Sequence, residues 1–106
     1  LAVTGTVTNR YDQSRQQILV QANLYNAEGD MVRKSTAFAG NMFEENELQT
    51  FDMSRINEEL SNREGDGNQN VGVQPGDTIP FTVVFSNLPD NLEELSVEVL
   101  SSESSE

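Results

Sequence analysis

Apolar side chains recur at every second position in several stretches, and this period constrains the fold more than any other feature of the chain. Five stretches share it: residues 1–8, 18–25, 31–38, 79–85 and 95–100. A period of two is typical of a β-strand with one buried face. Two antiparallel sheets packed face to face bury such faces against each other. The sequence therefore predicts an all-β fold, an immunoglobulin-like antiparallel β-sandwich of about seven strands once short edge strands, such as one over 46–50, are included.

The stretch over 79–85 is the most hydrophobic, and we expect it to form a central strand. Phe81, Val83 and Phe85 lie on one face, and the other face is also partly apolar. Pro80 stands near the start of the stretch, where a missing backbone donor is tolerated.

Turn residues separate the strands. In the turn over 74–77, Pro75 presets φ at the second position and Gly76 permits the positive φ that a type II turn needs at the third. A second turn over 26–30 joins two alternating stretches into a predicted β-hairpin. A third turn is expected over 88–91.

One stretch has a helical period instead, with apolar residues at i, i+3 and i+7: Met53, Ile56 and Leu60. This spacing predicts a short crossover helix over about 52–60, capped by Asp52 or Ser54 and packed on a sheet. The run over 61–70 has no apolar residue, so we expect a flexible loop there. The domain is predicted to span 1–100, and 101–106 to form a disordered polar tail.

Composition excludes several kinds of chemistry. The 106 residues include no cysteine and no histidine, which leaves no disulfide, no thiol or histidine-based catalytic pair and no ordinary zinc or haem site. Eighteen acidic residues against six basic ones give a formal charge of −12, which repels nucleic-acid phosphates and anionic membrane surfaces. We expect neither catalysis nor a bound cofactor.

One acidic run has the spacing of oxygen ligands for calcium, at Glu64, Asp66, Asn68 and Asn70. Alternating oxygen ligands can surround this ion when a glycine permits the bend, and Gly67 lies inside the run. The sixth and twelfth positions, where an EF-type loop needs glycine and glutamate, hold other residues. A solvated loop is the alternative interpretation.

Clusters of glutamates and aromatic residues offer two further hypotheses. Adjacent carboxylates at 44–47, 58–59 and 93–94 can suggest a hydrolase, but such neighbours usually face solvent. Exposed rings at Tyr11 and Tyr25 can suggest glycan binding. The rings at 43 and 51 are instead expected to anchor the crossover onto the core.

A series of short motifs resembles a known family: Gly5–Asn9, Leu24–Gly29, Ala39–Asn41 and Val73–Phe85, followed by Leu88–Pro89. In this order they resemble the bacterial domain of unknown function family 3426, from Leu1 to about Leu100, and more loosely the FxLYD-type extracellular domains. The most specific part contains Pro75, Gly76, Pro80 and Phe81.

The resemblance implies an immunoglobulin-like domain on the outer side of the bacterial inner membrane, after a zinc ribbon and one membrane helix. Neither element is within this sequence, so no residue here is assigned to the zinc site. The family has no established catalytic residues to carry over. The chain begins at Leu1 rather than methionine, and we expect it to be a piece of a longer protein.

The sequence thus predicts a non-catalytic extracytoplasmic module that binds a partner protein or acts as a spacer. The partner-facing part is expected to be the excursion over 39–70, because loops on a rigid sheet carry recognition. No direct membrane contact is expected from the domain itself. A calcium- or glycan-binding module is the alternative.

Overall fold

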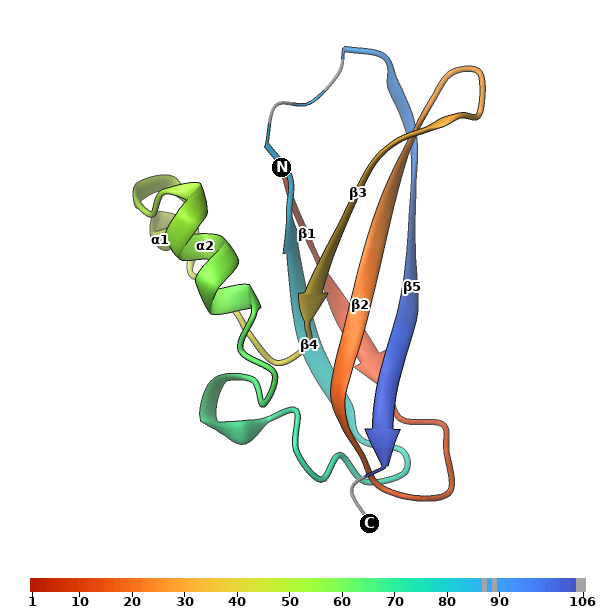
Figure 1. The fold of residues 1–106 in the computed structure, drawn as a ribbon, viewed down its shortest axis with the longest axis vertical. Helices are drawn as coiled ribbons and strands as arrows, with labels where there is room; N and C mark the ends of the chain where they lie inside the picture. The colour runs from red at the N-terminus through yellow and green to blue at the C-terminus, as the bar shows by residue number, and fades with distance from the viewer. Residues whose placement is uncertain (87, 89, 105–106) are drawn as a thin grey trace.

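The computed structural model describes residues 1–86, 88 and 90–104, and these form five β-strands and two α-helices (Figure 1). In chain order the elements are β1 (Ala2–Thr8), β2 (Arg15–Asn26), β3 (Met31–Phe38), α1 (Glu45–Thr50), α2 (Met53–Leu60), the 3₁₀ turn η1 (Asp66–Asn68), β4 (Thr78–Val84) and β5 (Leu92–Ser104). The predicted β class is confirmed. The described residues form five strands rather than about seven.

The strands form two antiparallel sheets. β1 pairs with β4, and the second sheet has the order β3-β2-β5. The hairpin predicted between β2 and β3 is confirmed, and Gly29 takes a φ of 84° in its turn. The predicted turn over 88–91 includes residue 89, which lies outside the described residues.

The alternating apolar rows of both sheets meet in one core. The buried members of these rows are Val3 and Val7 on β1, Val20, Ala22 and Leu24 on β2, and Ile79, Phe81 and Val83 on β4. Gly5 lies across from Phe81 in the β1–β4 register. A Cβ added to Gly5 would lie 2.8 Å from Phe81 Cζ, so the ring occupies the space above this glycine. The Phe81 ring can pack here because position 5 of β1 is a glycine.

The expectation that 79–85 forms a central strand is wrong. β4 has β1 as its strand neighbour in a two-stranded sheet. Its two faces are nevertheless both buried, with Thr82 and Val83 at 1% and 0% exposure. The second face is covered by the excursion, where the Thr82 hydroxyl donates to Met42 Sδ at 3.3 Å. The residues over 79–85 are hydrophobic on both faces because the excursion, rather than a second neighbouring strand, covers one face of β4.

The helix predicted over 52–60 is confirmed as α2, and the Asp52 side chain accepts a hydrogen bond from Arg55 N at 2.9 Å at its start. The edge strand predicted over 46–50 is wrong, because these residues form α1. The Glu44 N–H donates to Glu47 Oε1 at 2.8 Å and so satisfies one of the amides at the helix start. Leu48 packs against the core from this helix rather than from a strand.

The tail predicted to be disordered is partly ordered. β5 continues to Ser104, with Arg15 opposite Ser104 and Gln16 opposite Glu103. The Arg15 side chain also donates to Ser102 Oγ at 3.0 Å and to its carbonyl oxygen at 2.9 Å. Residues 105–106 of the predicted tail lie outside the described residues. An arginine on β2 therefore holds in place a polar segment that has no apolar side chain to bury.

Candidate functional site

The excursion between β3 and β4 is fixed to the sheets rather than flexible. α1 and α2 lie on the β4 side of the molecule, away from β5 (Figure 1). Ile56 and Leu60 of α2 are buried in the core. Asn41 Nδ2 donates to the carbonyl oxygens of Phe38 at 3.2 Å and Asn62 at 2.8 Å, which ties the start of the excursion to the segment that follows α2.

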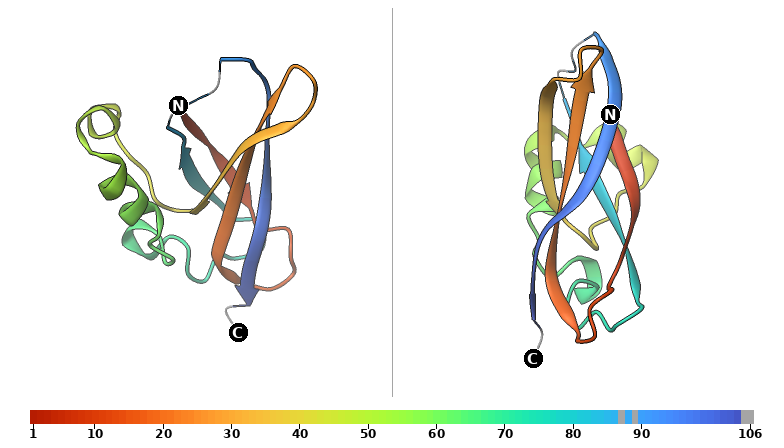
Figure 2. Two further views of the ribbon diagram at one scale, coloured as in Figure 1. Left: turned by 45° about the horizontal axis from the view of Figure 1, so that its top comes forward. Right: turned by 90° about the vertical axis from the view of Figure 1, so that its right-hand side faces the viewer.

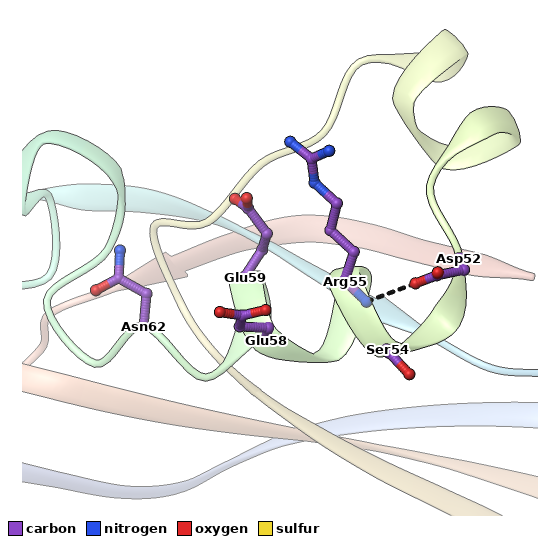
Figure 3. A pocket seen from close by; sticks show the side chains of 6 residues that line it. All are labelled: Asp52, Ser54, Arg55, Glu58, Glu59 and Asn62. Atoms are coloured by element: carbon purple, nitrogen blue, oxygen red, sulfur yellow. Dashed lines mark hydrogen bonds between the residues drawn. The ribbon is translucent and has the colours of Figure 1, made fainter.

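The outer face of α2 carries a shallow polar hollow (Figure 3). Its lining consists of Asp52, Ser54, Arg55, Glu58, Glu59 and Asn62. The guanidinium of Arg55 also stacks on the Phe51 ring at 3.8 Å. Figure 3 shows the side chains of Glu58 and Glu59 on α2; Glu58 is exposed, as predicted for adjacent glutamates, whereas Glu59 is half-buried. The hollow offers hydrogen-bonding groups on an open surface.

The four residues of the calcium hypothesis differ in burial. Glu64, Asp66 and Asn68 lie at the surface around η1, whereas Asn70 is fully buried. Asp66 Oδ2 accepts a hydrogen bond from Met42 N at 3.2 Å. Within the described part of the chain, no three acidic side chains gather as a metal site would require. Calcium binding stays a prediction, now without an available oxygen from Asn70.

Asn70 instead fastens the excursion to β2. Its Oδ1 accepts from Ile18 N at 2.9 Å, and its Nδ2 donates to Ile18 O at 3.0 Å. Its own carbonyl oxygen accepts from Gln17 N at 2.9 Å, where Gln17 takes a φ of 51°. The loop predicted to be flexible thus supplies a side chain that pairs with β2 as a neighbouring strand would.

The segment that carried the family resemblance organises the start of β4. Gly76 has a φ of 87°, and Asp77 N donates to Gln74 O at 2.9 Å across the turn that has Pro75 at its second position. The carbonyl oxygen of Pro80 accepts from Gly40 N at 2.7 Å. Phe81 fills the core above Gly5. These residues shape the domain and place no reactive group.

The aromatic residues have two different settings. Phe43 and Phe51 pack edge to face with ring centres 6.3 Å apart and lie against the core, as expected. Tyr11 is 58% exposed, and the Arg15 guanidinium lies 4.3 Å from its ring centre. Tyr25 is half-buried and shares a hydrogen bond of 3.2 Å with Ser96 Oγ.

The feature that sequence analysis missed is the uncovered inner face of β5. Leu95, Val97 and Val99 lie opposite Leu24, Ala22 and Val20 of β2. Directly opposed residues of two paired strands share a face, so the three β5 side chains point to the core side of the sheet. Their β2 partners are at most 2% exposed, yet they themselves are 50%, 41% and 53% exposed.

A groove runs beside this row, between β1 and β5. One wall comes from residues 6–8 and Arg10, the other from residues 97–99, and the buried side chains of Val20 and Phe81 form the floor. The hollow has a volume of about 380 Å³. A second hollow of about 200 Å³ continues it past Val99 towards Tyr11. In the right-hand view of Figure 2, β1 (red) and β5 (blue) diverge towards the bottom of the picture, where the chain leaves β1 for β2.

The family follows from the match of the whole domain. A family model described as a protein of unknown function (DUF3426) matches residues 1–99. The chain belongs to this family. No curated protein and no solved structure matches it. The DUF3426 match ends within β5, so it covers both sheets, the excursion and the groove. Neither helix of the described residues has the length and apolar character needed to cross a bilayer.

Proposed function

We propose that this DUF3426 domain is a non-catalytic binding module that holds a partner protein in the groove between β1 and β5. One observation carries the proposal: an apolar row that faces the core side of its sheet is left half exposed in a strongly acidic chain. Contiguous apolar surface of this kind marks interaction sites in soluble domains.

The groove combines features that a protein partner requires. Its floor is made of core residues, so its shape is fixed by the fold. Its β5 wall is an edge strand with β2 on one side only. An edge strand is a ready template for pairing with another chain. The groove thus offers apolar contact and backbone hydrogen bonds side by side.

The excursion over 39–70, expected from the sequence to face the partner, has a different role in this proposal. Its buried anchors, Ile56, Leu60 and Asn70, fasten it to the sheets. It covers the β4 side of the domain and leaves the β1–β5 side free. We assign it the role of a cover for β4, which makes the core possible with few strands.

The finer fold and the location are also part of the proposal. Two antiparallel sheets that share one core are consistent with a reduced immunoglobulin-like sandwich. The family resemblance supports a position outside the inner membrane, tethered by an upstream helix that follows a zinc ribbon. In this arrangement the domain would present the groove to other extracytoplasmic proteins.

Cysteine protection in intact cells tests the proposal, and the cysteine-free chain makes single labels simple. Val97→Cys places a thiol in the groove, and Thr36→Cys places one on the exposed outer face of β3 as the control. In the full-length protein, a membrane-impermeant maleimide should label Thr36→Cys equally in cells and after purification. Val97→Cys should be protected in cells only.

Two results would contradict the proposal. Equal labelling of Val97→Cys in cells and after purification would mean that nothing occupies the groove. Failure of the reagent to reach Thr36→Cys in intact cells, with normal labelling after lysis, would place the domain on the cytoplasmic side instead. Mass spectrometry of the labelled peptide distinguishes these thiols from any cysteines upstream.

A further inference from the structure

The edge of β5 restricts what kind of segment can occupy the groove, and this inference rests on the proposed function. β5 is a long strand that pairs with β2 and has no second strand neighbour among the described elements. A segment that pairs with its free edge must be extended, with side chains alternating between the two faces of the sheet.

The exposed row identifies β5, rather than β1, as the strand that is extended. β1 is also an edge strand, but its inner residues Val3 and Val7 are both 8% exposed. The fractional exposure of Leu95, Val97 and Val99 on β5 is more than five times as high, at 50%, 41% and 53%. A strand added next to β5 would cover this row, whereas a strand added next to β1 would find little apolar surface left to cover.

The inner and outer faces of β5 differ in charge. On the outer face, Glu94 and Glu98 lie opposite Tyr25 and Gln21, so each has a neutral cross-strand neighbour. Glu98 Oε1 accepts one hydrogen bond from Gln21 Nε2 at 3.1 Å. A neighbouring strand with cations at the matching positions would complement these two carboxylates, since opposite charges on adjacent strands attract.

Two guanidinium groups border the groove on the side of β1 and in its continuation. Arg10 stands on its β1 wall, and Arg15 borders the continuation past Val99. Arg15 is held by Ser102 and stacks on Tyr11. The lining of the groove combines the apolar side chains of Val7, Val20, Phe81, Val97 and Val99 with Thr6, Thr8, Arg10 and Glu98. Apolar side chains that enter the groove can cover the valines and Phe81.

We infer that the free edge of β5 binds an extended segment of a partner protein in which apolar residues alternate with lysine or arginine. The apolar side chains cover Val97 and Val99 inside the groove, and the basic side chains face Glu94 and Glu98 on the outer face of the sheet. The net charge of −12 attracts the same segment over a longer range.

Designed peptides as long as β5 test the inference with the 106-residue chain. The probe alternates valine and lysine; one control has the same composition arranged in two blocks, and another alternates valine and glutamate. Fluorescence anisotropy should show the alternating lysine peptide binding at least about tenfold more tightly than either control. Backbone amide shifts should change along β5 and not along α2.

A matched pair of variants separates local from overall charge. E94K/E98K should weaken binding of the lysine peptide about tenfold and strengthen binding of the glutamate peptide. E58K/E64K changes the net charge by the same amount at exposed positions of the excursion and should leave both affinities unchanged. Equal effects of the two variants would mean that only overall charge is sensed, and would overturn the inference.

Other outcomes also decide the question. If the block peptide binds as tightly as the alternating one, alternation has no role and the inference fails. If the chain sediments as a dimer that E94K/E98K dissociates, a second copy is the occupant and the inference fails. If Val97→Cys is protected in cells while the peptides do not bind, the proposed function stands and only the partner chemistry is wrong.

Discussion

Replacing the exposed β5 row with threonine should cost the domain little stability. The variant L95T/V97T/V99T has a β-branched residue, which favours strands, at all three positions, and it removes apolar surface. Each side chain is about half exposed already, at 50%, 41% and 53%. Threonine keeps one methyl group, so each change removes only one or two carbons, worth about 0.8 kcal/mol each when fully buried; at half exposure the loss is about 0.4–0.8 kcal/mol per position and about 1–2 kcal/mol in total.

The matched control lies opposite on β2. Val20 pairs with Val99 and is 0% exposed. V20T loses a buried methyl group, worth about 0.8 kcal/mol, and buries a hydroxyl at a further cost of about 1–3 kcal/mol. The single core change should therefore cost about 2–4 kcal/mol, more than the triple change on β5.

Urea denaturation followed by circular dichroism at 25 °C measures both free energies of unfolding. A cost of about 4 kcal/mol or more for the triple variant, with a smaller cost for V20T, would refute the reasoning. The β5 row would then be part of the core, and its exposure would no longer support a binding surface in the groove.

Three further predictions concern residues that hold the fold or the loop. N70A leaves the Ile18 N–H buried without a partner, while the Ile18 carbonyl keeps the N–H of Ala39, and should cost about 1–3 kcal/mol in urea denaturation; N57A on the exposed face of α2 should change stability by less than about 0.5 kcal/mol, and equal small effects would contradict the role of Asn70. G5A forces the Phe81 ring to shift and should destabilise by about 1–3 kcal/mol in the same assay; a stabilised variant would show that the ring does not need this space. Calcium at about 10 mM, a concentration that saturates even weak extracellular sites, should leave the melting temperature unchanged because the side chain of Asn70 is already bonded to Ile18; a saturable rise that D66N abolishes would restore the calcium hypothesis.

The strands could be predicted because their signal is local. Alternation at Val3 and Val7 and the turn at Gly76 depend on neighbours in sequence, and each appears in the structure as expected. The cover over β4 could not be predicted in the same way. The apolar second face at Val84 indicates burial without saying whether strands or an excursion provides it, and here the excursion does.

The candidate site depends on contacts between residues far apart in sequence. Val97 and Val99 alternate like any buried row, and their exposure follows from which elements lie opposite β5. On the core side of the three-stranded sheet, the row on β2 is covered and the neighbouring row on β5 is not. The burial of Asn70 could not be predicted for a related reason. In a run of polar residues, no local feature of the sequence distinguishes the amide side chain that enters the core.

Photo-crosslinking in cells tests the central claim most directly. A photoreactive residue is placed at Val97 or Val99 of the full-length protein, and at Thr36 or Glu58 as controls on other exposed surfaces. The account predicts a covalent adduct with a second protein from the two groove positions and none from the controls. Adducts of equal yield at all four positions, or none from β5, would contradict it.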